Sequence, residues 1–126
     1  MRPIMIVEDN PAIAAYIDDV LREEGSLTQI CSTGASGLAA IAQRAPSLVL
    51  LDYHLPDMTG LQLIARLHQR GGPVVPIVLM TASWERPDWR AGGATAFLAK
   101  PFTIEELISC VNEGRAKHKQ ADSGTR

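Results

Sequence analysis

The sequence predicts an α/β fold in which one parallel, five-stranded sheet is covered by helices on both faces. Two observations indicate this class. Short apolar runs alternate with helix-like patterns along the chain, and the first run is apolar throughout, as in a strand buried on both sides. The expected strands are Ile4 to Val7, Leu27 to Cys31, Leu48 to Leu51, Ile77 to Met80 and Ala96 to Ala99.

Helix-boundary residues separate these runs. Asn10 followed by Pro11 is typical of a helix start, and Thr103 with Glu106 forms a capping-box pair. Gly25 and the pair Gly71-Gly72 are expected helix ends. The expected helices run from Pro11 to Gly25, from about Ala35 to Arg44, from Gly60 to Gly71, and onward from Thr103.

Length and composition predict one domain. The chain has 126 residues, of which 46% are hydrophobic, enough for a single core. We expect the domain to cover residues 1–116, with a polar tail or linker stub from Lys117 to Arg126. A net charge of −2 gives no electrostatic reason to expect nucleic-acid binding. The chain shows neither a membrane-span pattern nor a signal-peptide pattern, so a cytoplasmic protein without a membrane partner is expected.

Side chains suited to binding a cation and a phosphoryl group stand at the ends of four predicted strands. Because carboxyl ends of parallel strands meet at one sheet edge, we expect them to converge. Three adjacent carboxylates repel by about 4 kcal/mol per pair at an effective dielectric near 20, and Mg²⁺ would relieve this repulsion. Asp52 is then the predicted phosphoryl acceptor, Glu8 and Asp9 the metal ligands, and Thr81 and Lys100 the groups that stabilise phosphoryl oxygens.

Each of these features alone also has an ordinary structural interpretation. An acidic pair at a strand end is commonly a loop or helix-cap feature, and Asp52 before a proline-containing loop is a common turn former. Their occurrence together, each at a strand end, favours the functional interpretation.

At these positions the chain resembles the receiver domain of two-component response regulators, from Ile4 to about Arg115. The motifs that carry the resemblance are Val7 to Asn10, Leu50 to Gly60, Met80 to Ala82 and Phe97 to Phe102. It implies a flavodoxin-like, doubly wound (βα)₅ fold with strand order 2-1-3-4-5.

The resemblance also implies a phosphorylation-dependent signalling switch. Asp52 would accept phosphate from a phosphohistidine on a sensor histidine kinase or a histidine phosphotransfer protein. Mg²⁺ would be held by Glu8, Asp9, Asp52 and the backbone carbonyl of His54, and the Lys100-Pro101 bond would be cis. The downstream effector is not identified by the sequence.

Further roles follow from the same resemblance. Thr81 and Phe97 occupy the family's switch positions, although Phe97 can also be read as a plain core residue. His54 and Ser83 lie two residues beyond Asp52 and Thr81, where family members tune dephosphorylation.

The chain departs from the family between Thr81 and Lys100, where about three residues, close to one helical turn, are missing. We expect a shortened fourth helix of at most two turns, about Pro87 to Ala91, or irregular backbone. Both tryptophans fall here. Trp84 and Trp89 either cover core left bare by the shortened helix or form a partner surface. The family's usual homodimer mode, which uses this face, becomes doubtful.

Two other functions remain as alternatives. A small phosphatase or phosphotransferase of the haloacid-dehalogenase type also uses an aspartate nucleophile, but it carries a second Asp where this chain has His54. A degenerate receiver that only docks is disfavoured because every site position holds a competent residue. We therefore expect a phosphoacceptor that assists its own phosphorylation and dephosphorylation rather than a turnover enzyme.

Overall fold

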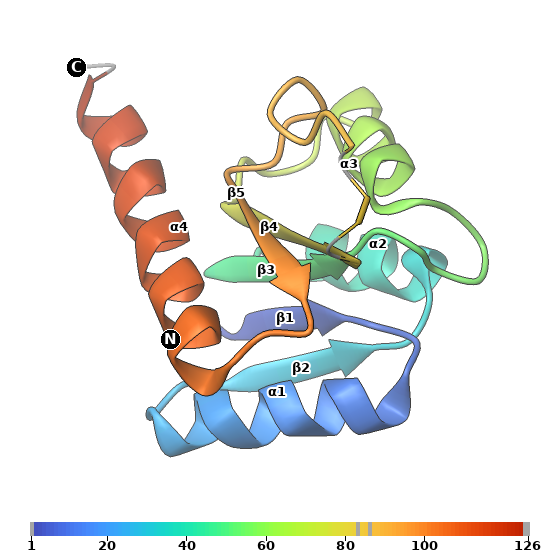
Figure 1. Ribbon diagram of the computed structural model, residues 1–126. Coiled ribbons are helices and arrows are strands. Elements are labelled where there is room, and N and C mark those ends of the chain that lie inside the picture. Colours follow the sequence, from blue (N-terminus) through green and yellow to red (C-terminus); the bar gives the residue numbers. More distant parts are fainter. Residues whose placement is uncertain (1, 83, 86, 125–126) are drawn as a thin grey trace.

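The computed structural model describes residues 2–82, 84–85 and 87–124, and its centre is a sheet of five parallel strands (Figure 1). The strand order is β2-β1-β3-β4-β5, which confirms the predicted order. Four of the five strand starts lie where the apolar runs predicted them; β2 begins one residue later. The strands are β1 Ile4–Val7, β2 Thr28–Cys31, β3 Leu48–Asp52, β4 Ile77–Ala82 and β5 Ala96–Lys100.

Four helices connect or follow the strands: α1 Pro11–Glu23, α2 Gly34–Gln43, α3 Gly60–Gln69 and α4 Ile104–Gly124. The predicted caps are present. The side chain of Asn10 accepts hydrogen bonds from two amides of the first turn of α1. Thr103 and Glu106 exchange the two capping-box hydrogen bonds at 2.9 and 3.1 Å.

Alternate residues of the strands face opposite helix layers. In β3, Val49 and Leu51 pack with α2 and α3, whereas Leu48 and Leu50 pack with α1 and α4. Because successive side chains of a strand point to opposite faces, Asp52 continues the α1 and α4 side. On β4, Leu79 belongs to the α2 and α3 side, so Thr81 continues that side.

The loop between β3 and α3, residues 53–59, is tied to the rest of the fold. The carboxylate of Asp57 accepts hydrogen bonds from the amides of Gly34 and Ala35 at 2.8 and 2.9 Å, at the start of α2. These two hydrogen bonds lower the pKa of Asp57 below its ordinary value. At the end of the loop, a Cβ on Gly60 would lie 2.8 Å from the backbone oxygen of Asp52, so the turn into α3 requires glycine.

We call residues 84–95 the β4–β5 segment. Its described residues, 84–85 and 87–95, form turns and no helix, so the prediction of irregular backbone in place of a full fourth helix is confirmed. A single i to i+4 hydrogen bond joins the amide of Gly92 to the carbonyl of Asp88 at 3.0 Å. The positive φ of Gly93, 99°, reverses the chain toward β5.

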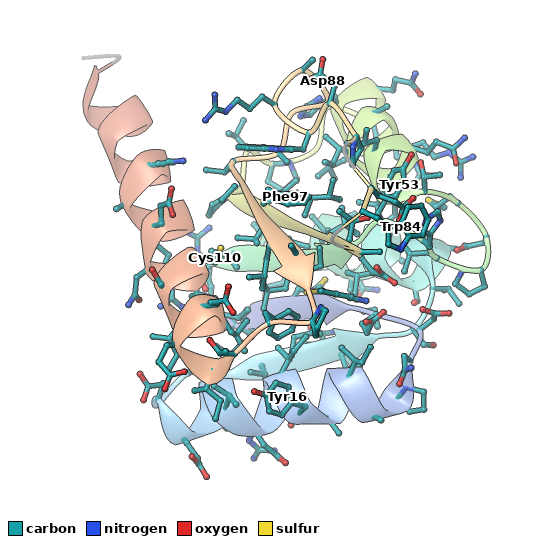
Figure 2. All side chains as sticks on the ribbon, in the orientation of Figure 1. Tyr16, Tyr53, Trp84, Asp88, Phe97 and Cys110 are labelled. Atoms are coloured by element: carbon teal, nitrogen blue, oxygen red, sulfur yellow. The ribbon has the colours of Figure 1, made fainter. Side chains whose placement is uncertain are left out.

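The two tryptophans of this segment have different surroundings. Figure 2 labels Trp84 and Phe97, the residue on which Trp89 stacks. The ring of Trp89 stacks on Phe97 of β5, with centroids 6.2 Å apart and planes inclined by 18°, and it packs against the core under α2 and α3. The side chain of Trp84 is 80% exposed. Trp89 therefore covers core surface, as one of the two interpretations predicted, and Trp84 does not.

The last helix is longer than the sequence suggested. Lys117 to Arg126 was expected to be a polar tail or linker stub, but α4 continues to Gly124. Apolar periodicity ends before Lys117, and this predicted the end of the helix. A helix can continue without a buried apolar face once it no longer packs on the core. Good helix formers and the i,i+4 ion pair of Glu113 with Lys117, at 2.8 Å, support its continuation.

No helix in the part of the chain that the structure describes combines the length and the apolar character needed to cross a membrane.

Candidate functional site

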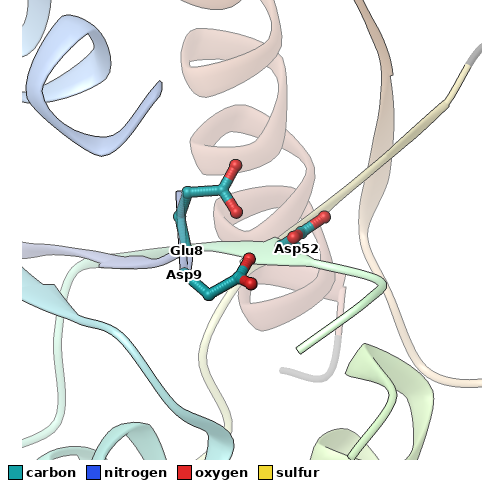
Figure 3. Close-up of side chains that lie close together, drawn as sticks. All are labelled: Glu8, Asp9 and Asp52. Atoms are coloured by element: carbon teal, nitrogen blue, oxygen red, sulfur yellow. The ribbon is translucent and has the colours of Figure 1, made fainter. Parts of the chain in front are cut away.

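Three carboxyl groups meet at the carboxyl edge of the sheet (Figure 3). Glu8 and Asp9 follow β1 and Asp52 ends β3, and these strands are neighbours because Val7 pairs with Leu51. One oxygen from each carboxyl group lies within 4.8 Å of the others. Glu8 and Asp52 are buried and Asp9 is exposed. The predicted carboxylate trio is therefore assembled.

Lys100, at the end of β5, reaches the same carboxylates. Its Nζ lies 2.6 Å from Oε1 of Glu8 and 3.2 Å from Oδ1 of Asp52. Burial opposes the charged ammonium, but the hydrogen bond that it donates to Glu8 and the charges of both carboxylates outweigh burial and raise the pKa of Lys100. The Lys100 ammonium therefore lies against both Glu8 and Asp52.

The pKa and the hydrogen bonding of Glu8 indicate that a further cation can bind beside it. Burial and the adjacent Asp52 raise its pKa to about 7, against the opposite effect of Lys100. Its Oε2 is buried and has no hydrogen-bond partner among the described residues. An unpartnered buried carboxylate oxygen beside two other carboxylates is a hard-oxygen ligand set, which fits Mg²⁺.

The hydroxyl of Thr81 is engaged by a residue that the sequence did not single out. Thr81 is buried at the end of β4, and its Oγ1 donates a hydrogen bond to Oε1 of Glu85 at 2.9 Å. The other carboxylate oxygen, Oε2, lies 2.7 Å from Nε2 of His54. One sequence feature could have indicated this contact. Glu85 lies only four residues after Thr81, in a segment too short to form a helix that would place it farther from the site.

The other residues predicted for the site are His54, Phe97, the Lys100-Pro101 bond and Ser83. The exposed ring of His54 points to Glu85 rather than into the carboxylate trio. Phe97 is half-buried and stacked on Trp89, away from the carboxylates, and the Lys100-Pro101 bond is cis, as predicted. Ser83 lies outside the described residues.

The sequence matches the response regulator receiver domain family over residues 4–112. The chain belongs to this family. It is thus a receiver domain of two-component signal transduction, and the alternative of a haloacid-dehalogenase-type enzyme is wrong. Its relatives are named as regulators rather than as enzymes.

Two curated relatives show the extent of the match. The DNA-binding response regulator MtrA of Mycolicibacterium smegmatis is 38% identical over 111 residues, 86% of this chain and 48% of that protein. The uncharacterized transcriptional regulatory protein YkoG of Bacillus subtilis is 38% identical over 127 residues, 97% of this chain and 55% of that protein. The chain spans about half the length of the curated relatives it matches.

Solved receiver domains share the fold. That of NtrX from Brucella abortus has a TM-score of 0.81 at 30% identity, with 90% of this chain and 98% of that chain covered. A CheY-like receiver domain protein from Methanospirillum hungatei has a TM-score of 0.84 at 28% identity, with 95% and 98% covered. The curated relatives are named as DNA-binding or transcriptional regulators, which bears against the expectation of no nucleic-acid partner. We therefore apply that expectation only to the residues of this chain.

Proposed function

We propose that this receiver domain is a signalling switch in which Asp52 accepts a phosphoryl group from a phosphohistidine of a partner protein. The observation that carries the proposal is the contact of the Lys100 ammonium with both Glu8 and Asp52, at 2.6 and 3.2 Å, inside a trio of carboxylates. A buried acceptor beside a fixed cation is the arrangement that phosphoryl transfer needs, because the reaction depends chiefly on positioning and charge.

The residues would divide the reaction as follows. A carboxylate oxygen of Asp52 forms the new bond to phosphorus while the bond from phosphorus to the donor imidazole breaks. Lys100 pairs with a phosphoryl oxygen, and the hydroxyl of Thr81 donates a hydrogen bond to another. Phe97 and the residues around it would respond to the new position of Thr81.

A bound Mg²⁺ would neutralise charge on the phosphoryl oxygens. Glu8, Asp9, Asp52 and the backbone carbonyl of His54 are its proposed ligands. Support comes from the unpartnered oxygen of Glu8 and the proximity of the three carboxylates. Without the cation, these carboxylates would oppose an incoming dianionic group.

The partner in this proposal is a sensor histidine kinase or a histidine phosphotransfer protein of the cytoplasm. Two-component membership supports it. The chain would act as a phosphoacceptor that assists its own phosphorylation and dephosphorylation, with His54 and Ser83 as the residues that adjust the lifetime of the phosphorylated state.

The test is incubation with Mg²⁺ and a small-molecule phosphodonor such as acetyl phosphate, followed by intact mass. We expect the wild-type chain to gain one phosphoryl group, and Asp52→Asn to gain none. Removing Mg²⁺ with a chelator should abolish the gain in the wild type. No added mass, or the same added mass in Asp52→Asn, would contradict the proposal.

Lys100→Met is a useful second variant because it removes the cation but keeps a long side chain. It should still bind Mg²⁺ through the carboxylates while its phosphorylation slows. Retention of the folded state is checked by circular dichroism in every variant.

A further inference from the structure

Near the site, the β4–β5 segment contacts β4 and β5 through two side-chain interactions of different chemistry; at its far end, Thr95 is hydrogen-bonded to Ile77. The first is polar: Glu85 accepts the hydroxyl hydrogen of Thr81 and contacts His54. The second is apolar: Trp89 stacks on Phe97. Thr81 and Phe97 lie on adjacent strands, where Leu79 pairs with Phe97 and Thr81 pairs with Ala99. Both attachments therefore reach the same corner of the sheet.

The polar attachment uses the same hydroxyl that a phosphoryl group would need. A threonine hydroxyl has one proton to donate, so the hydrogen bond to Glu85 and one to a phosphoryl oxygen exclude each other. The other carboxylate oxygen of Glu85 contacts His54, so the side chain is held on the Thr81 hydroxyl from two directions.

We propose that Glu85 is a positioning residue that occupies the Thr81 hydroxyl in the unphosphorylated protein, and that a phosphoryl group on Asp52 displaces it and releases the start of the β4–β5 segment. This inference rests on the proposed function. It makes Glu85 an internal competitor of the phosphoryl group, acting through Thr81.

The contacts of the neighbouring tryptophans indicate which part of the segment is released. Trp84 immediately precedes Glu85 and is 80% exposed, so few contacts hold it once the carboxylate leaves. The stack of Trp89 on Phe97 does not involve Glu85, so loss of the Glu85 contact alone leaves it in place. Among the described residues, release therefore concerns Trp84 and Glu85, which lie just beyond the end of β4.

The experiment uses beryllofluoride with Mg²⁺, a non-covalent mimic of the phosphoryl group. Its half-saturating concentration is measured for the wild type, Glu85→Ala and Glu85→Gln. Loss of one charge-assisted competing hydrogen bond should lower the half-saturating concentration by roughly tenfold in Glu85→Ala. Glu85→Gln keeps an acceptor without the charge and should fall between the two.

A double-mutant cycle with Thr81→Val shows whether the effect passes through the hydroxyl. In the Thr81→Val background, Glu85→Ala should change the half-saturating concentration by less than about twofold, since coupling disappears when the shared group is absent. A spectroscopic measurement accompanies it. In a Trp89→Phe background, Trp84 fluorescence should respond to beryllofluoride, and Glu85→Ala should show the altered spectrum before beryllofluoride is added.

The possible results distinguish a failure of this inference from a failure of the proposed function. Tighter binding in Glu85→Ala that depends on Thr81 supports the inference. Wild-type phosphorylation with unchanged or weaker binding in Glu85→Ala overturns the inference and leaves the proposed function standing. Equal tightening with and without the Thr81 hydroxyl also overturns it, because the effect would then be general electrostatics. A wild-type chain that takes no phosphoryl group on Asp52 overturns both.

Discussion

Two connections flank the carboxylates at the edge of the sheet, and they are held in different ways. The loop of residues 53–59 is fixed to α2 by the side-chain carboxylate of Asp57, which accepts two backbone amide hydrogen bonds, and it leads into α3 through a glycine packed on the carbonyl of Asp52. The β4–β5 segment has one aromatic stack and one carboxylate attachment at the site.

The two sides of the carboxylate trio therefore differ in what holds them. On the 53–59 side, the contacts involve backbone groups: the amides of Gly34 and Ala35, and the carbonyl of Asp52 beside Gly60. On the β4–β5 side, the contacts to Thr81 and Phe97 are made by side chains, and a backbone hydrogen bond to β4 is formed at Thr95. The following substitutions test this contrast, beginning with the largest expected effect.

Trp89→Ala should remove the main apolar contact of the β4–β5 segment. Because the ring is half-buried against Phe97 and the core below it, we expect a loss of about 2 kcal/mol in the free energy of unfolding, measured by urea denaturation. Trp89→Phe, which keeps an aromatic ring there, should lose less. A loss below about 0.5 kcal/mol in Trp89→Ala would show that the stack does not hold the segment.

Gly60→Ala should disturb the fixed loop. The added Cβ would meet the backbone oxygen of Asp52 at 2.8 Å, and backbone cannot move aside as a side-chain tip can. We expect a loss of about 1 to 2 kcal/mol in unfolding free energy and slower phosphorylation. Gly37→Ala is the matched control, since its nearest contacts are side-chain carbons of Val7 at 3.1 and 3.3 Å. Equal losses in both variants would contradict the special role of Gly60.

Asp57→Asn should weaken the attachment of the loop to α2 by removing the charge that accepts two amide hydrogen bonds. The folded-state pKa of Asp57 lies below its ordinary value of 3.8, so its ionisation stabilises the fold above that pH. This contribution is lost as the pH falls through the folded-state pKa. The stability difference between wild type and variant should therefore be larger near neutral pH than near pH ~3, in urea titrations at both. A difference independent of pH would contradict this account.

Trp84→Ala should have the smallest effect on stability, within about 0.5 kcal/mol, because its side chain is largely exposed. The comparison with Trp89→Ala in the same assay separates the two tryptophans. If Trp84 is a partner surface, affinity for a kinase or effector falls while the melting temperature stays unchanged. A large fall in melting temperature would assign Trp84 to the core.

The sequence predicted the strands and the carboxylate trio because both follow from local signals, whereas the strand order came from the resemblance to receiver domains. Apolar runs mark strands, and residues at the ends of parallel strands must meet. Glu85 was missed since its contact with Thr81 depends on how the shortened segment folds back, which no periodicity encodes. The split between Trp84 and Trp89 and the extension of α4 were missed for the same reason: each depends on where tertiary contacts exist or end.

The alternation of β-strand side chains has a consequence for how such a domain can diversify. Asp52 continues the face of the sheet covered by α1 and α4, whereas Thr81 continues the face where Trp89 packs. A group bridging the two residues straddles the sheet. A substitution in the core layer over one face of the sheet can therefore leave the packing of the other layer unchanged, although both layers border the same site.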